Sequence, residues 1–190
     1  MQRLSIIFMV TVSALVSLGV GLLGPVYTIF VVDRFSASLV DVGVLSAVFG
    51  FVAAVFKVPS GRLVDLYGKE KVLFVGLVPG AICSLSYVLA FDLYYLYIIE
   101  FLFGVSYALQ SSSLLALTMT TSSKDNRGLL LGVFDSAYDV AGAVAAILSG
   151  IIVSRFGFEP LFLACSGFHA ITGFFILIRK YAFLKGHLHY

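Results

Sequence analysis

The sequence predicts an all-α integral membrane protein with six transmembrane helices, and three observations lead to this class. First, 61% of the 190 residues are hydrophobic, and the mean hydropathy is +1.08. Second, the apolar residues occur in long runs, and a helix needs about 20 mostly apolar residues to cross a hydrocarbon layer of about 30 Å. Third, part of the sequence repeats at a fixed offset. Six runs are present, at roughly residues 4–32, 41–61, 72–91, 93–118, 128–153 and 160–178.

The six runs leave almost no residues for a soluble domain, so residues 1–190 are expected to form a single domain. The first run is too long for a signal peptide and is interpreted as the first membrane helix. Pro25, beside Gly24, predicts that this helix is bent. The two cysteines have no metal-binding spacing, and the net charge of +2 gives no indication of nucleic-acid binding. We therefore expect no cofactor, no metal and no nucleic-acid partner.

Basic residues decide the orientation, because Lys and Arg near helix ends stay on the cytoplasmic side. With the N-terminus inside, the outer segments hold only Arg34 and Arg155. The cytoplasmic segments hold nine, namely Arg3, Arg62, Lys69, Lys71, Lys124, Arg127, Arg179, Lys180 and Lys185. Both termini are therefore predicted to be cytoplasmic, most simply in a plasma membrane.

A shift of 89 residues aligns residues 60–70 with residues 149–159, and Ser, Gly, Val, Gly and Glu coincide between them. Each copy holds three helices, so the second copy enters the membrane from the opposite side, as in many secondary transporters. We expect an inverted 3+3 repeat, with repeat one at 1–91, repeat two at 92–180 and a short cytoplasmic tail at 181–190.

The segment between the second and third runs resembles the corresponding loop of the major facilitator superfamily, which reads approximately G-x-L-a-D-R-x-G-R-R/K. Leu66 and Glu70 depart from that pattern, since the family has basic residues there. The matching positions are Gly61, Leu63, Asp65, Gly68 and Lys69. Family members normally have twelve helices in two six-helix halves, so the resemblance implies that this sequence is one half domain.

The resemblance also implies a function. It predicts transport of a small-molecule substrate across a lipid bilayer by alternating access, driven by a proton or ion gradient. The half would work as a homodimer or with a separate second half. A gating loop would contain Gly61, Arg62, Asp65, Gly68 and Lys69, with the two glycines shaping a tight turn. Asp65 would reach the fifth helix of the opposing half near Ser123 to Asp125, where the helix dipole suits a carboxylate.

Ionisable residues inside the runs are costly in a membrane and mark candidate functional positions. Asp135 and Asp139 are four residues apart and share one helix face near the membrane midplane. We favour proton coupling or cation binding at this pair over a structural role. Glu100 could carry a proton, and with Tyr107 and Ser111 it gives one helix a polar stripe facing a cavity. Lys57 is expected to extend its amine to the interface, in preference to pairing with Asp135.

Two other functions stay open. Ser106 and His169 resemble the Ser–His dyad of rhomboid proteases, since a serine needs a neighbouring base to become a nucleophile. The inverted repeat has no explanation in that case, so we do not expect an enzyme. A non-transporting membrane partner or sensor built on the same half fold is the second alternative.

Overall fold

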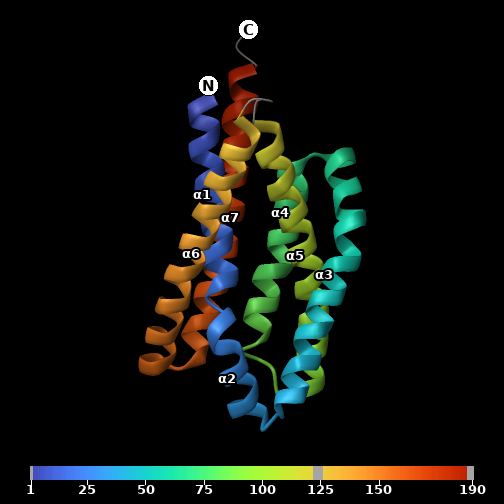
Figure 1. Ribbon diagram of the computed structural model, residues 1–190, viewed down its shortest axis with the longest axis vertical. Coiled ribbons are helices and arrows are strands. Elements are labelled where there is room, and N and C mark those ends of the chain that lie inside the picture. Colours follow the sequence, from blue (N-terminus) through green and yellow to red (C-terminus); the bar gives the residue numbers. More distant parts are fainter. Residues whose placement is uncertain (1, 122–125, 188–190) are drawn as a thin grey trace.

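The computed structural model describes residues 2–121 and 126–187, which form a bundle of seven α-helices (Figure 1). The start of α1 and the end of α7 lie at the same end of this bundle. The predicted all-α class is confirmed for the described residues. The helices are α1 (Gln2–Gly21), α2 (Gly24–Phe35), α3 (Leu39–Tyr67), α4 (Lys69–Ser86), α5 (Leu93–Thr121), α6 (Arg127–Phe156) and α7 (Phe158–His187).

Five spans in the described chain are long and apolar enough to cross a membrane, and α1 and α2 together make the first of them. The third predicted run, residues 72–91, corresponds to α4, which has only 18 residues, begins with charged residues at 69–71 and is not among these five spans. It also ends at Ser86 and not near residue 91, because a turn follows. Several of its side chains, such as Leu73 and Leu77, are nevertheless fully buried. α4 is thus a central helix of the bundle.

The first predicted helix is interrupted. Leu22 and Leu23 form a turn between α1 and α2, and Pro25 lies in the first turn of α2. Proline has no backbone N–H and fits the start of a helix, where that donor would have no partner in any case. The bend expected from Pro25 is therefore present as a break between two helices.

The predicted loop at Gly61 is wrong. The second run was expected to end at residue 61, but α3 continues to Tyr67 and carries Gly61, Arg62 and Asp65 on its last turns. Only Gly68 breaks the helix, with φ of 90°, a conformation that favours glycine. Its N–H still bonds the Val64 carbonyl, as in a helix. Apolar residues such as Val64 pack inward here, so α3 remains helical beyond the apolar run.

The repeat seen in the sequence has structural counterparts. A shift of 89 residues carries the bounds of α3 to residues 128 and 156, and α6 covers Arg127–Phe156. Gly157, the counterpart of Gly68, also has positive φ, and its N–H bonds the carbonyl of Val153, the counterpart of Val64. The repeat relates the helix pair α3–α5 to the pair α6–α1. Both pairs pack extensively. The exact limits of the two repeats stay a prediction.

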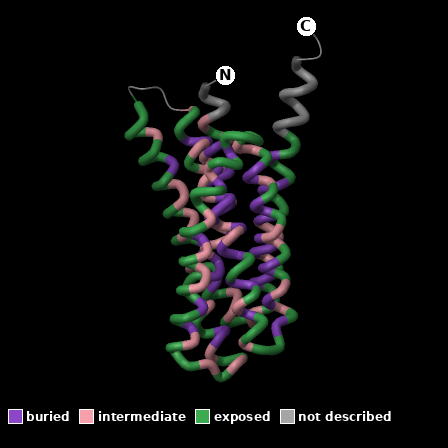
Figure 2. Tube along the Cα trace, turned by 90° about the vertical axis from the view of Figure 1, so that its right-hand side faces the viewer, coloured by how far each residue is buried: buried purple, intermediate pink, exposed green. Residues whose placement is uncertain are grey.

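Buried residues recur along the length of the bundle (Figure 2). One apolar cluster surrounds Phe30, Tyr87 and Phe162, beside the α1–α2 break. A second surrounds Val12, Leu73 and Leu77, between α1 and α4. α3 and α6 are covered least, since only 17% of their most apolar windows is buried, against 44–50% for the other spans.

Close packing of α3 against α5 at Gly104 gives a first prediction. A Cβ at Gly104 would lie 2.8 Å from the Phe49 carbonyl oxygen and 3.0 Å from Val52 Cβ. Gly104→Ala should lower the free energy of unfolding by about 1–3 kcal/mol, because the backbone of α3 must move. The measurement is thermal or SDS unfolding followed by circular dichroism.

Gly50→Ala on α3 is the matched control, since nothing lies within 4 Å of its Cβ position. Alanine is the better helix former by about 1 kcal/mol, so this variant should be as stable as the original or more so. Equal stability of the two variants would contradict the packing described here.

Candidate functional site

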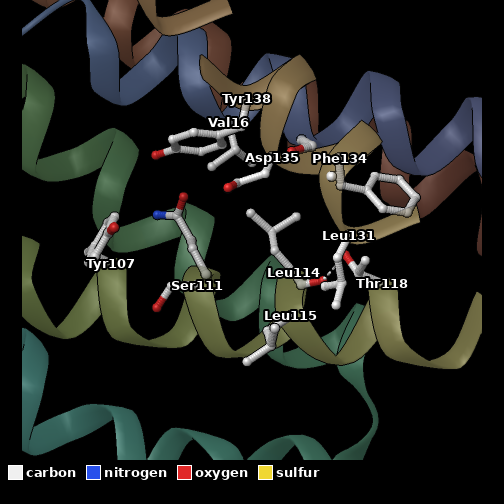
Figure 3. A pocket seen from close by; sticks show the side chains of 13 residues that line it. Val16, Tyr107, Ser111, Leu114, Leu115, Thr118, Leu131, Phe134, Asp135 and Tyr138 are labelled. Carbon is white, nitrogen blue, oxygen red and sulfur yellow. Dashed lines mark hydrogen bonds between the residues drawn. The ribbon is translucent and has the colours of Figure 1, made fainter. Parts of the chain in front are cut away.

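A pocket of about 400 Å³ lies between α1, α5 and α6 (Figure 3). Its lining residues belong to three of the segments that are long and apolar enough to span a membrane. Its lining residues are Ser13, Val16, Tyr107, Gln110, Ser111, Leu114, Leu115, Thr118, Leu131, Gly132, Phe134, Asp135 and Tyr138.

The pocket has two chemically different ends. In Figure 3, Asp135 and Tyr138 on α6 reach toward Tyr107 and Ser111 on α5. We call these four residues with Gln110 the polar end. At the other side of the same view lie Leu114, Leu131 and Phe134, which we call the apolar end. The arrangement follows from helix periodicity, because residues three or four apart on α5 and on α6 face the same side.

Gln110 is held in one orientation by neighbouring helices. Its side chain is 1% exposed, and Nε2 donates to the Gly76 carbonyl at 3.3 Å and to Ser106 Oγ at 2.9 Å. A carbonyl only accepts hydrogen bonds, so the amide nitrogen must be the atom facing Gly76. Oε1 of Gln110 is buried and has no hydrogen-bond partner in the described part of the chain.

Glu100 occupies a second position, apart from this pocket. Its side chain is 5% exposed, and Oε1 accepts a hydrogen bond of 2.7 Å from the Tyr87 hydroxyl. A smaller cavity of about 190 Å³ beside it is lined by Glu100, Tyr87 and Tyr27. The Tyr27 hydroxyl is buried without a hydrogen-bond partner among the described residues. This carboxyl therefore sits in an apolar cavity with phenol groups, next to the break between α1 and α2.

The residues assigned to the gating loop gather at one end of α3 and α4. Lys69 Nζ donates to Thr120 Oγ1 on α5. Asp65, Gly68 and Lys69 line a cavity of about 490 Å³, and Asp65 with Gly61 lines a neighbouring one of about 440 Å³. Arg62 lines neither cavity and is exposed. The partner segment proposed for Asp65, Ser123 to Asp125, includes residues outside those described.

Lys57 also lines the 440 Å³ cavity. Its ammonium lies 5.5 Å from the centre of the Tyr107 ring, within the range of a cation–π contact. The side chain is exposed, and its contact is thus with an aromatic face and not with Asp135.

Ser106 and His169 lie on either side of Gly80. A Cβ there would be 2.8 Å from Ser106 Oγ and 2.9 Å from His169 Nε2. The serine hydroxyl, however, donates to the Gly76 carbonyl at 2.7 Å, and His169 Nδ1 bonds the Cys165 carbonyl at 2.8 Å. Nε2 has no partner in the described part of the chain. The serine is therefore not activated by the histidine in this arrangement.

Sequence reasoning located part of the site. Tyr107, Ser111 and Asp135 line the same pocket, as the predicted polar cavity requires. Asp139, one turn along α6, is exposed and is not among the lining residues, and Glu100 belongs to the other cavity. The roles proposed for all these residues stay predictions.

Two residues of the polar end were not predicted from the sequence as site residues. Gln110 and Tyr138 each lie three positions after a residue that was, Tyr107 and Asp135 respectively. The spacing of three placed them on the same faces and was the signal that could have identified them.

Comparison with known proteins agrees with this architecture. The model of the Major Facilitator Superfamily matches residues 9–187. The chain belongs to this superfamily. It is therefore an integral membrane protein of a transporter family, which confirms the predicted fold class. The chain spans less than half the length of the curated relatives it matches. This length agrees with the half domain predicted from the sequence.

Among these relatives is an uncharacterised MFS-type transporter of Methanocaldococcus jannaschii, 24% identical over 86% of the chain and 42% of the relative. A hexuronate transporter of Bacillus subtilis is 27% identical over 70% of the chain and 32% of the relative. The class H tetracycline resistance protein of Pasteurella multocida is 26% identical over 95% of the chain and 44% of the relative. The names of the second and third relatives mention two different compounds, hexuronate and tetracycline.

The contact between Tyr87 and Glu100 gives a second prediction. Tyr87→Phe removes the hydroxyl that satisfies a buried carboxyl, and the unfolding free energy should fall by about 1–3 kcal/mol. The measurement is thermal or SDS unfolding of the purified protein in detergent. Tyr94→Phe is the control, because Tyr94 lies on α5, the helix of Glu100, and is 77% exposed, so losing its hydroxyl should change the stability little. An unaltered Tyr87→Phe protein would argue against a buried hydrogen bond.

Proposed function

We propose that this protein moves a small solute across the membrane by alternating access, paired with a second six-helix unit. The observation that supports this most directly is the pocket lined by Asp135, which lies among membrane-spanning helices and combines polar and apolar walls. A carboxylate at membrane depth is costly unless it faces protein or water, and such residues mark substrate or ion pathways. Membership in a superfamily of transporters supports the same function.

Pairing with a second unit is supported by the uneven covering of the bundle. Asp135 and Asp139 on α6 are exposed, as are apolar residues on α3 and α6 such as Phe51 and Ile147. Lipid can cover the apolar residues, but it offers no partner for a carboxylate. A second copy of the chain related by a two-fold axis along the membrane normal would cover α6 and enclose the pocket.

Coupling to a proton gradient is proposed to involve Glu100. Glu100 is buried and hydrogen-bonded to the Tyr87 hydroxyl, and ionisable residues at membrane depth mark ion or proton pathways. Its neighbours are two phenols and it lies next to the α1–α2 break, where a change in charge could alter how the helices pack. Asp135, in the larger pocket, is then available for the solute.

We propose that both termini lie in the cytoplasm and that the membrane is the plasma membrane; the distribution of basic residues supports this orientation. We propose no enzymatic activity, because the hydroxyl of Ser106 is hydrogen-bonded to a carbonyl. We also propose no cofactor, since the sequence contains no nucleotide-binding motif.

A third prediction concerns assembly. Native mass spectrometry of the protein released from a mild detergent or nanodisc should give twice the 20.5 kDa chain mass. The double variant Asp135→Asn, Asp139→Asn should keep the mass of the dimer if the apolar faces of α3 and α6 hold the two chains together. A persistent monomer would contradict a homodimer and direct attention to a different second half.

A fourth prediction concerns transport. Proteoliposomes holding the protein, tested on a supported membrane with a panel of cationic, neutral and anionic solutes, should give currents that depend on an imposed pH gradient. Glu100→Gln, which cannot release a proton, should remove the response to the gradient. Solute binding should be unchanged by it, because Glu100 lies outside the larger pocket.

Glu159→Gln is the matched control, since it removes the same charge from the first turn of α7, and this exposed residue lines none of the cavities described above. Equal loss in both variants would argue against a specific role of Glu100. Gradient-independent flux in the unmodified protein would indicate facilitation. No flux with any solute, from a verified dimer, would favour the alternative function of a membrane partner or sensor.

A further inference from the structure

We propose that the pocket between α1, α5 and α6 binds an amphipathic organic ammonium ion, with the ammonium at the polar end and its hydrocarbon body at the apolar end. This inference rests on the proposed function, because it names the substrate class of the same site.

Charge is the first argument. Asp135 is the one charged residue among the described residues that line the pocket. Recognition of a carboxylate or phosphate generally uses Arg or Lys, and none of these lining residues is basic. Lys57 is near, but it lines the neighbouring cavity and lies over the Tyr107 ring. An anionic ligand would meet a carboxylate without a compensating base, whereas a cation would neutralise it.

The hydrogen-bonding groups are the second argument. Both hydrogens of the Gln110 amide are directed to Gly76 and Ser106, so Oε1 faces away from these groups and has no partner among the described residues. The side chain is 1% exposed and lines the pocket. Gln110 Oε1 and the Asp135 carboxylate are both acceptors. An ammonium group has three donors and no acceptor, and therefore matches them.

Aromatic rings are the third argument. Tyr107 and Tyr138 both line the polar end, and the face of a tyrosine ring attracts cations. The Lys57 ammonium, 5.5 Å from the centre of the Tyr107 ring, already makes such a contact with one of these rings. Two phenol rings beside a carboxylate favour an organic ammonium ion over a strongly hydrated metal ion.

The apolar end indicates that the remainder of the ligand is hydrocarbon. Leu114 follows Gln110 by one turn of α5, and Thr118 follows it by two, so the apolar end begins about 6 Å from the amide and extends to about 12 Å. Leu131 and Phe134 complete this end from α6. Burying hydrocarbon there is favourable by about 25 cal/mol per Å². A metal ion would leave these walls without an apolar partner, whereas a chain of several carbons ending in a ring would reach them.

Three probes of equal size separate the charge classes, namely 4-phenylbutylammonium, 4-phenyl-1-butanol and 4-phenylbutyrate. Their binding is measured by isothermal titration calorimetry with the full chain in nanodiscs of uncharged lipid, and empty nanodiscs give the partitioning of each probe into lipid. The amine should bind about tenfold or more tightly than the alcohol, and the carboxylate most weakly.

Two variants test the polar end. Asp135→Asn should remove the preference for the amine over the alcohol, with the alcohol affinity unchanged. Gln110→Leu should lower the amine affinity without changing the order of the three probes. Asp135→Glu should retain the preference, which distinguishes loss of charge from loss of fold, and circular dichroism checks each variant. Asp33→Asn removes a charge of the same sign from α2, outside the pocket, and should behave like the unmodified protein.

Several outcomes would overturn the ammonium class. These are equal binding of the three probes, tightest binding of the carboxylate, no binding above empty nanodiscs, or an amine preference that survives Asp135→Asn. None of them decides whether the protein transports a solute, since the flux measurements with the wider panel test that separately. A protein that binds the amine but carries no flux would keep the ligand class and overturn the transport function.

Discussion

The close contact between α4 and α5 at Gly76 is the constraint on which the pocket depends. A Cβ at this position would lie 2.8 Å from Leu109 Cβ and 3.1 Å from the Gln110 backbone nitrogen, so only glycine allows the helices to approach this far. The same approach brings the Gly76 carbonyl within reach of Ser106 and Gln110. Small residues commonly have this role between membrane helices, where packing and hydrogen bonds replace the hydrophobic effect.

Because no water is available in hydrocarbon, the groups that remain without partners are informative. The amide nitrogen of Gln110 is satisfied by α4 and α5, and its oxygen is not. Tyr27 has an unpaired hydroxyl beside Glu100. Both of these groups belong to residues that line a cavity with a carboxyl group. The fold thus separates a buried carboxyl next to the α1–α2 break from an open one in the larger pocket.

The sequence was sufficient for the fold class and for five of the six spans, because these depend on hydropathy, and the constant offset indicated the repeat. It was insufficient at Gly61, where a loop motif lies on a helix: the apolar run ends, but Val64 still packs inward and keeps α3 helical. Helix ends depend on such tertiary contacts as well as on composition.

The candidate site was predictable only in part for a related reason. Spacing of three or four residues indicates that Tyr107 and Ser111 share a face, but not which neighbouring helix that face meets. Asp135 and Asp139 illustrate the limit, since both lie on one side of α6 and only Asp135 lines the pocket. The orientation of Gln110 depends on Gly76, a residue 34 positions away, and no local pattern shows it.

The repeat also bears on what must cover the bundle. It relates α3 to α6, and these two helices have the least buried windows of the five spans. The two copies of the repeat therefore each leave one helix, α3 or α6, poorly covered by the rest of the bundle. On α6 the bare surface includes Asp135 and Asp139, whose charges cannot face lipid without cost. A partner against this surface would convert an open pocket into an enclosed one, and its departure at one end would open it to that side of the membrane. In the proposed function, enclosure of the carboxylate by a second unit would be the step that connects the half fold to alternating access.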